Sequence, residues 1–210
     1  MVRRAGSNGV RTAAIVRDAG IRLIYQHGYE AMSLRELASE VGVQPGSLYK
    51  YFRNKEGLLF DIMKAHMDEL LEQIQETLAP VAGPRERLLA FATFHLRYHR
   101  DRLRQLHIVN AELRCLGREP RAEIVAMRRI YEEILQDILA EGSEAGVFNL
   151  KDIRISSFAI IAMLTGIGAW YRPDGRLELE EIVEIHLGLM MDGVLSSPAI
   201  APRARASAVR

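Results

Sequence analysis

A helix-turn-helix pattern near the N-terminus constrains the fold of this 210-residue chain more than any other feature. Ser33 and Glu36 form a capping box, in which the serine hydroxyl can accept a hydrogen bond from the amide of residue 36 while the glutamate side chain returns to the amide of Ser33. Gly42 stands at a turn that needs a positive φ angle, and Pro45 stands where a first-turn proline loses no hydrogen bond. The segment therefore predicts two short helices, over 34–41 and 45–52, joined by a tight turn.

The second short helix has the composition of a surface that faces a partner. Leu48 and Phe52, four residues apart, would anchor it to the core. Gly46 costs about 1 kcal/mol of helix stability relative to alanine, and it would let the backbone approach another surface closely. Such a helix fits the major groove of DNA, about 12 Å wide, with Lys50 and Lys55 beside phosphates. The remaining side chains of this segment are polar: Gln44, Ser47, Tyr49, Lys50 and Tyr51. A solvated surface is the alternative interpretation for each of them.

The rest of the chain carries helical periodicity. Apolar residues recur at three- and four-residue spacing, and no strand-like alternation bounded by hairpin turns is found. The sequence therefore predicts an all-α fold of about nine helices. Their expected ranges are 10–27, 34–41, 45–52, 55–79, 84–100, 102–116, 119–145, 152–170 and 179–195. We expect an N-terminal three-helix helix-turn-helix domain over 1–55, a C-terminal helical ligand-binding and dimerisation domain over 56–197, and a disordered tail over 198–210.

Positive charge is concentrated near the N-terminus. Residues 1–55 carry nine Lys and Arg against four Asp and Glu, a net charge of +5, whereas residues 56–210 carry 19 against 23, a net charge of −4. A local basic excess of this kind suits a polyanion, although a solvated basic surface would give the same count.

Composition narrows the remaining classes. The single cysteine, Cys115, excludes an internal disulfide and a cysteine-based zinc cluster. The longest uncharged stretch, 155–171, has 17 residues, at the lower limit for a membrane span, so we expect a helix buried in protein and no membrane contact. No apolar run follows the first four residues, which favours a cytoplasmic protein without a secretory signal.

Enzymatic and metal-binding interpretations have little support. Sequence patterns of nucleotide-binding loops, nucleophile elbows and zinc proteases are absent, so neither catalysis nor a cofactor is expected. His95 and His99 lie four residues apart on one predicted helix, with His107 and Glu112 beyond them. A helical metal-binding protein is therefore an alternative, but spacing places no third ligand, and ordinary packed or solvated histidines are the favoured interpretation.

The segment from Gly28 to Leu58 resembles the N-terminal domain of TetR-family transcriptional regulators. The residues that carry this resemblance are Gly28, Tyr29, Ser33–Ala38, Val41–Val43, Gly46–Phe52 and Asn54–Leu58. The resemblance implies an all-helical, homodimeric DNA-binding repressor, or less often an activator, whose C-terminal domain binds a small molecule that changes its DNA affinity. It assigns to the recognition helix Gln44, Pro45, Gly46, Ser47, Tyr49 and Lys50. It assigns phosphate contacts to Tyr51 and Lys55, and it places Ser33 at a helix start beside the DNA backbone.

A second resemblance concerns the effector. The run 170–177, Trp-Tyr-Arg-Pro-Asp-Gly-Arg-Leu, looks like the branch of the family that controls fatty-acid, branched-acid or steroid catabolism, in which acyl-CoA thioesters are common effectors. Asn110 shares a helical face with Leu103 and Leu106 and is expected on a buried stripe, where a ligand could be its hydrogen-bond partner. The candidate pocket residues are Phe91, Phe94, Tyr98, Asn110, Arg114, Met163 and Trp170. Core packing is the alternative for each.

Dimerisation is expected through the last two long helices. Small residues around Gly166 permit close helix approach, and the last helix carries an apolar face formed by Leu187, Met190, Met191 and Val194. Two such helices from each subunit would form a four-helix interface, as the resemblance implies, and a twofold dimer would match a palindromic operator. The alternative is that these faces belong to the core of one chain.

The expected partners are therefore double-stranded DNA, a small hydrophobic effector such as an acyl-CoA thioester, and a second copy of the chain. A regulator that acts only through protein partners is the remaining alternative. The helix over 55–79 joins both regions, so effector binding is expected to tilt it and to change the separation of two recognition helices, which must match a DNA turn of about 34 Å.

Overall fold

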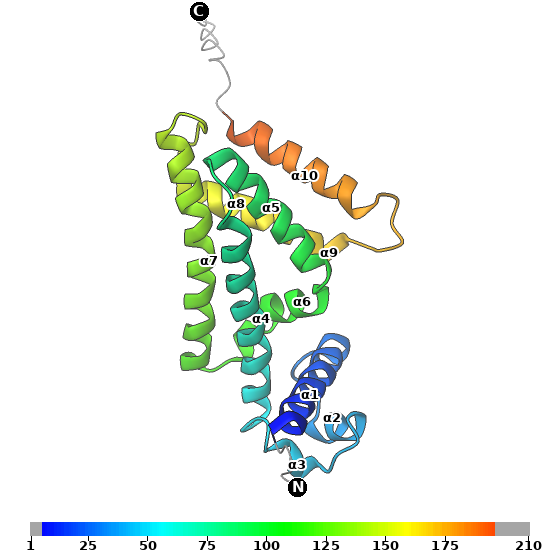
Figure 1. Ribbon diagram of the computed structural model, residues 1–210. Coiled ribbons are helices and arrows are strands. Elements are labelled where there is room, and N and C mark those ends of the chain that lie inside the picture. Colours follow the sequence, from blue (N-terminus) through cyan, green and yellow to red (C-terminus); the bar gives the residue numbers. More distant parts are fainter. Residues whose placement is uncertain (1–5, 196–210) are drawn as a thin grey trace, which may run out of the picture.

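The computed structural model describes residues 6–195, with side chains described for residues 11–195. Figure 1 shows a molecule built from helices, and the only β contact in this part of the chain is an isolated bridge between Phe148 and Leu195. The elements are α1 (Gly6–His27), α2 (Leu34–Glu40), α3 (Pro45–Leu48), α4 (Lys55–Leu78), α5 (Pro84–Arg100), α6 (Leu103–Ala111), the 3-10 helix η1 (Leu113–Cys115), α7 (Arg118–Glu144), α8 (Ile153–Thr165), α9 (Ile167–Trp170) and α10 (Leu179–Val194). The predicted all-α fold is confirmed, and the tail expected over 198–210 lies outside the described residues.

Helices α1, α2 and α3 form a small unit at one end of the molecule (Figure 1). The chain turns after α1 at Gly28, with φ of 80°, and after α2 at Gly42, with φ of 70°, and glycine takes both angles without steric penalty. Leu37 and Leu48 are fully buried between the three helices. Local turn geometry and a few apolar contacts therefore fix the orientation of α3.

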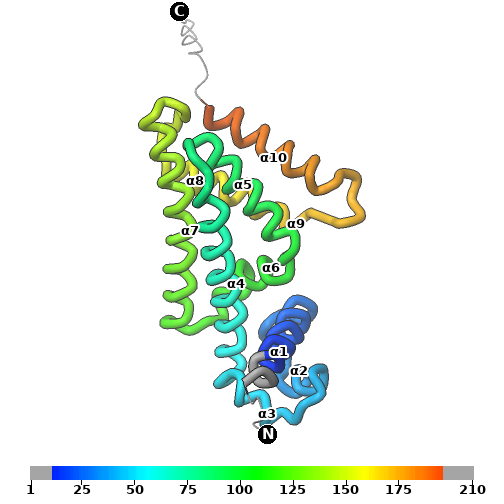
Figure 2. The backbone as a smooth tube through the Cα atoms, viewed as in Figure 1, coloured from blue at the N-terminus to red at the C-terminus, as the bar shows by residue number. Residues whose placement is uncertain are grey.

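Helix α4 connects this unit to a larger helical bundle. Figure 2 shows α4 running from α3 into the bundle, where α4, α5 and α7 pack against one another. Leu59, Met63 and Ile74 of α4 are fully buried, and the 24 residues of the helix include no proline that would interrupt it. Helix α8 packs on α5 and α7, and α10 packs on α5 at the end away from α1 to α3.

Three expected helices are shorter or divided in the structure. The helix expected over 102–116 ends at Ala111, because the backbone of Glu112 leaves the helical region and a short 3-10 turn follows. The helix expected over 152–170 divides at Gly166 into α8 and α9, since glycine is among the weakest helix formers. The helix expected over 45–52 ends at Leu48 and continues as turns.

One stretch of the described residues, Ile153–Trp170, is long and apolar enough to span a membrane when judged by length and composition alone. Ser157, Ile160 and Leu164 of this stretch are buried against the bundle. Ile155 and Phe158 point away from it and are exposed in the single chain. The stretch is therefore a packed bundle helix with one uncovered apolar face.

Candidate nucleic-acid interface and ligand cavity

Local hydrogen bonds hold the helix-turn-helix, and they include the serine half of the predicted capping box but not the returning bond from the Glu36 side chain, which lies 3.6 Å from His27 Nε2 instead. The Ser33 hydroxyl accepts a hydrogen bond from the amide of Glu36 at 3.2 Å, which caps α2. The amide of Val43 donates to the carbonyl of Ala38 at 2.9 Å and closes the turn. At the start of α4, the Asn54 side chain accepts from the amide of Gly57 at 2.7 Å. These caps fix where each helix begins and therefore which side chains of α3 face outward.

Most of the predicted interface residues in α3 and its flanks are exposed. Tyr49 is 58% exposed, a large fraction for an aromatic side chain that lies beside two buried residues, Leu48 and Phe52. The exposed members of the predicted interface are Ser33, Gln44, Pro45, Gly46, Tyr49 and Lys50. Ser47 and Tyr51 are half-buried. The structure thus leaves most of the predicted recognition residues accessible, and an exposed tyrosine and lysine are among them.

Lys55 has a structural role beside its predicted one. Its Nζ atom donates a hydrogen bond to the carbonyl of Glu30 at 2.9 Å and lies 4.5 Å from the centroid of the Tyr29 ring. The ammonium group has three donors, so this anchoring leaves capacity for a phosphate contact. Lys55 therefore ties the loop after α1 to the start of α4 at the edge of the interface.

One further contact joins the N-terminal helices to the bundle, because the Glu112 carboxylate accepts a hydrogen bond from the amide of Tyr29 at 3.1 Å. A second contact ties the start of α4 to the start of α7, where the Glu56 carboxylate accepts a hydrogen bond from the amide of Gly117 at 2.6 Å. Helix α6 also packs directly on α1. The segment from α6 to the start of α7 is therefore the direct physical connection between the two regions, in addition to α4.

A cavity of about 140 Å³ lies inside the bundle, bounded by α4, α5, α6, α7 and α8. Three buried histidines line it: His66 from α4, and His95 and His99 from α5. The ring centroids of His95 and His99 are 4.4 Å apart, and those of His66 and His99 are 5.5 Å apart. His95 is hydrogen bonded through Nδ1 to the Tyr131 hydroxyl at 3.0 Å and through Nε2 to the Thr165 hydroxyl at 3.1 Å.

Burial keeps the three imidazoles neutral. It lowers the pKa of His66 to about 4 and that of His95 to about 3, and it holds the pKa of His99 well below its ordinary value. The charged neighbours Arg102 and Arg128 act on His66 in the same direction, and Glu69 opposes them. At neutral pH each ring therefore has one N–H donor and one nitrogen acceptor.

Arg128 contributes a cation to the rim of this cavity. Its guanidinium donates to the carbonyl of Val109 and lies 3.4 Å from Oδ1 of Asn110. Burial lowers the pKa of Arg128, but a guanidinium stays protonated in proteins. Arg128 forms no salt bridge within the part of the chain that the structure describes.

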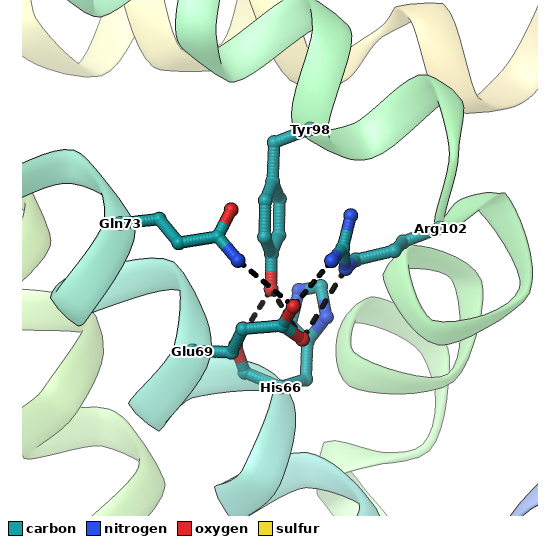
Figure 3. Close-up of polar contacts among 5 residues, drawn as sticks. All are labelled: His66, Glu69, Gln73, Tyr98 and Arg102. Atoms are coloured by element: carbon teal, nitrogen blue, oxygen red, sulfur yellow. Dashed lines mark hydrogen bonds and ion pairs between the residues drawn. The ribbon is translucent and has the colours of Figure 1, made fainter. Parts of the chain in front are cut away.

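A polar cluster joins α4 to the end of α5 beside the cavity, and of its five residues only His66 also lines the cavity (Figure 3). Arg102 pairs with the Glu69 carboxylate and stacks on the Tyr98 ring, with 4.1 Å from the guanidinium carbon to the ring centroid. Gln73 donates to Glu69 at 2.9 Å, and the Tyr98 hydroxyl donates to the carbonyl of His66 at 3.1 Å. The hydrogen bonds from Arg102 hold the pKa of Glu69 below its ordinary value. The cluster clamps α4 to α5 next to the buried histidines.

The predicted pocket residues do not meet in one cavity. Asn110 is exposed, in contrast to the expected buried stripe, because α6 ends one residue later and its side chain reaches the rim. Phe91 is fully buried in the core against Tyr131. Arg114 is exposed on η1, and Met163 is half-buried against the core. Phe94 and Tyr98 line a separate, more open groove of about 580 Å³ between α4 and α5.

Trp170 lines another hollow, of about 450 Å³, between α9 and α10. Its indole stacks on the His186 ring, with centroids 5.8 Å apart and an angle of 13° between the planes. Arg172 and Arg176, in the segment that follows α9, also line this hollow. A further hollow of about 330 Å³, lined by Gly168 and Ala169, lies along α9 and shares Thr165 and Asn110 with the histidine cavity.

Much of the expected dimer face is covered within the single chain. Met190, Met191 and Val194 are buried, because α10 packs this side on its own bundle. Leu187 is half-buried and Gly166 lies in the break between α8 and α9. On these two helices the large apolar side chains that remain exposed are Ile155 and Phe158 on α8, and Ile185 and Leu189 on α10. The surface of contact between two copies stays a prediction, and these four exposed side chains are available for it.

The main cavity residues that sequence reasoning missed are His66, Arg128, Tyr131 and Thr165. The four-residue spacing of His95 and His99 was the visible signal, since it places two imidazoles on one helical face. Nothing local to His66 shows that α4 brings it against them.

A fixed helix-turn-helix with an exposed tyrosine and lysine on its second helix, carried on a helical bundle with an internal cavity, defines a class: helix-turn-helix DNA-binding regulators. Comparison with known families agrees. Residues 6–62 match the model described as bacterial regulatory proteins of the tetR family, and residues 81–194 match the tetracyclin repressor-like C-terminal domain. The chain belongs to the TetR family of transcriptional regulators.

Curated relatives and a solved structure are similar over most of the chain. The fatty acid metabolism regulator protein of Bacillus subtilis is 26% identical over 179 residues, covering 84% of this chain and 92% of the relative. The transcriptional repressor KstR2 of Mycolicibacterium smegmatis is 29% identical over 175 residues, covering 81% and 84%. The crystal structure of AibR in complex with isovaleryl coenzyme A and operator DNA has a TM-score of 0.79 and 31% identity, covering 85% of this chain and 97% of AibR.

Proposed function

We propose that this chain is a repressor that binds a palindromic operator as a homodimer and is released by a small hydrophobic effector, an acyl-CoA thioester. It acts by binding and not by catalysis, in the cytoplasm. The observation that carries the proposal is the exposure of Gln44, Pro45 and Gly46 at the start of α3 and of Tyr49 and Lys50 directly after it, next to the buried Leu48.

The DNA contact follows from this face. Helix α3 enters the major groove, where Gln44, Ser47 and Tyr49 meet base edges and Lys50 meets a phosphate. Lys55 and the capped start of α4 face the DNA backbone on the adjacent side, since amides at a helix N-terminus attract phosphate oxygens. The net charge of +5 over residues 1–55 supports binding to a polyanion.

The dimer is formed by the apolar face that a single chain leaves uncovered. Ile155 and Leu189 are 63% and 64% exposed, and Phe158 and Ile185 lie beside them on the same two helices. An alanine-sized side chain at Gly188 would meet no atom within 4 Å, so a second helix can approach α10 closely. A second copy of the chain, and not lipid, covers this face. Twofold symmetry through α8 and α10 places two copies of α3 on successive major grooves.

The effector class is supported by AibR, whose structure holds isovaleryl coenzyme A. It is also supported by three hollows in this chain, each lined in part by residues of α8 or α9. The inner histidine cavity accepts the acyl group. The outer hollow combines the Trp170 indole with Arg172 and Arg176, a combination that suits the base and phosphates of the coenzyme.

The effector acts on DNA binding through α6. This helix lines the cavity with Leu106 and Val109, packs on α1, and ends at Glu112, which binds the Tyr29 amide. An occupied cavity displaces α6 and α4 and changes the separation of the two copies of α3. The coupling free energy between the two sites then equals the difference between the binding free energies of the effector for the DNA-binding arrangement and for the displaced arrangement.

The test is a selection of binding sequences from random DNA duplexes, followed by fluorescence anisotropy with the enriched duplex. We expect a palindrome, an affinity that falls steeply with salt, and release by isovaleryl-CoA but not by coenzyme A alone. The proposed function is contradicted if no sequence is enriched. An enriched sequence with no release by any acyl-CoA contradicts the effector class alone.

A further inference from the structure

The hollow between α9 and α10 is lined by two aromatic rings that leave room for a third. The planes of the Trp170 indole and the His186 imidazole are 13° apart, and their ring centroids are separated by 5.8 Å. Ring atoms in contact are about 3.5–4.0 Å apart, so two nearly parallel rings with this centroid separation overlap only in part. Trp170 is also 52% exposed. Part of the indole surface is therefore open to another flat ring.

The hydrogen bond of His186 fixes which ring nitrogen is the acceptor. Nδ1 lies 2.7 Å from the carbonyl oxygen of Ile182, one turn earlier in α10. A carbonyl oxygen only accepts, so Nδ1 carries the hydrogen, and Nε2 of the neutral ring has a free lone pair. Nε2 has no hydrogen-bond partner in the described residues, yet it keeps accessible surface, in contrast to Nδ1 of His66 and His99. Because His186 lines the hollow, it offers a hydrogen-bond acceptor there.

Positive charge lies at the edge of the same hollow. Arg172 and Arg176 line it, both are exposed, and neither forms an ion pair with another described residue. Leu177 and Ile182 add apolar surface to the wall. The hollow thus combines an open aromatic face, one acceptor and two available guanidinium groups.

This combination matches an adenine nucleotide. A base that stacks on the indole lies nearly parallel to the imidazole, so an in-plane hydrogen bond between its edge and Nε2 of His186 is possible. The acceptor requires a donor on that edge. Adenine presents an exocyclic amino group, whereas guanine presents a carbonyl oxygen, which would place two lone pairs against each other. The guanidinium groups of Arg172 and Arg176 suit the phosphates.

We propose that Nε2 of His186 accepts a hydrogen bond from the amino group of adenine, and that this chain therefore recognises the base of its effector as well as the acyl group. The inference rests on the proposed function, in which the nucleotide end of an acyl-CoA thioester occupies this hollow, and it adds the residue that reads the base. A free adenine nucleotide carries the same amino group, so ATP is included in the experiment.

The experiment uses isothermal titration calorimetry with the full-length protein in mildly alkaline buffer. Isovaleryl-CoA is compared with an analogue in which hypoxanthine replaces adenine, so that a carbonyl oxygen stands in place of the amino group. We expect wild type to bind the adenine thioester about tenfold more tightly, as for one net hydrogen bond. His186→Phe keeps a flat ring without the acceptor and should reduce this preference to about twofold or less. Trp170→Ala should weaken both thioesters about tenfold through lost stacking.

A control and four outcomes decide the inference. His27→Phe, on α1 at the other end of the molecule, should keep the wild-type preference. Equal affinity of the wild-type protein for the two thioesters overturns the inference, needs no variant to fold, and leaves the effector class standing. An undiminished preference in His186→Phe overturns it by assigning base recognition to another residue.

The remaining two outcomes concern the source of the nucleotide. Tighter binding of ATP than of isovaleryl-CoA overturns the inference in favour of a free nucleotide. Failure of both thioesters to bind overturns it together with the proposed effector class, while operator binding remains a separate result.

Discussion

Oε1 of Glu112 lies 3.1 Å from the backbone nitrogen of Tyr29, although 83 residues separate the two in the sequence. Glu112 ends the helix that lines the histidine cavity, and Tyr29 begins the loop that leads into α2. One hydrogen bond therefore connects a wall of the cavity to the helix-turn-helix.

We expect Glu112→Ala to weaken the communication between effector and operator. The variant leaves the Tyr29 amide without its partner, which costs about 1 kcal/mol of stability, and it removes one connection between α6 and the N-terminal helices. Operator affinity without effector should change less than threefold, whereas the weakening of DNA binding by isovaleryl-CoA should fall by about fivefold. Anisotropy titrations with and without the thioester measure both quantities. Glu133→Ala, an exposed position on α7, is the control, and an unchanged effector response in Glu112→Ala would exclude this connection.

The second prediction concerns the outer face of α3. Lys50→Ala should weaken operator binding and reduce the slope of log affinity against log salt by about one, because one phosphate contact is lost. Tyr49→Ala should weaken binding without changing this slope, since an uncharged contact releases no counterion. Helical content by circular dichroism should be unchanged in both. Lys151→Ala, an exposed lysine between α7 and α8, provides a control with the same loss of charge, and an equal loss of affinity there would contradict the assignment.

Gly46 allows a test that separates folding from binding. A side chain at this position would meet no atom within 4 Å in the free protein, so Gly46→Ala should keep or raise the melting temperature. We nevertheless expect operator affinity to fall about tenfold, because the added methyl group faces the DNA at the start of the recognition helix. Gly42→Ala should show the opposite pattern of stability: its φ of 70° is strained for alanine, and the protein should melt at a lower temperature. An unchanged operator affinity in Gly46→Ala would show that α3 does not approach DNA closely there.

The buried histidines predict how stability depends on pH. Their pKa values are lowered in the folded state, so between the ordinary pKa of about 6.5 and the folded value of about 4 for His66 the unfolded chain binds more protons. The free energy of unfolding should therefore be highest above pH 6.5 and should decrease as pH falls to 4, by up to about 1.4 kcal/mol per pH unit for each histidine.

Urea unfolding at several pH values measures this dependence. His99→Leu should flatten it between pH 6.5 and 4, because it removes one of the buried neutral imidazoles. Identical slopes in the wild type and in His99→Leu would contradict the burial of a neutral imidazole at position 99. Glu69, whose pKa is also lowered, adds a loss of stability at still lower pH as its carboxylate becomes protonated.

The fifth prediction addresses assembly. Leu189→Glu and Phe158→Glu should convert a dimer at micromolar concentration into a monomer, because each places two carboxylates near the twofold axis of a desolvated interface. Operator affinity should fall by at least about 100-fold in both, since one α3 contacts only a half-site. Sedimentation velocity measures the state of assembly. Ile130→Glu, at a similarly exposed position on α7, should stay dimeric, and dimers of both interface variants would place the contact elsewhere.

The helix-turn-helix could be predicted from the sequence because its signals act within a few residues. The Ser33 cap, the positive φ of Gly42 and the first-turn Pro45 each determine the backbone next to them, and the structure has all three as expected. The family was recognisable from the same segment, and the comparisons confirm it.

The bundle was less predictable because periodicity identifies an apolar face but not the element that covers it. The face of α10 that contains Met190 and Met191 packs on its own chain, and Leu189, one position before them, is the exposed residue. The histidine cavity forms only where α4 packs on α5, and His66 lies 29 residues before His95 in the sequence. Asn110 was expected on a buried stripe, but α6 ends at Ala111 and Asn110 lies at the rim of the histidine cavity. These are consequences of long-range packing, which local sequence patterns do not contain.

The residues that line the histidine cavity lie between positions 66 and 165, and those on the outer face of the helix-turn-helix lie between 33 and 55, so the two sets have no member in common. Under the proposed function, substitutions in the cavity would change the recognised effector without changing the bound operator, and the reverse also holds. For engineering, the cavity residues and the helix-turn-helix residues can be mutagenised in separate libraries, provided that Glu112 and Glu56 are retained where the two regions meet.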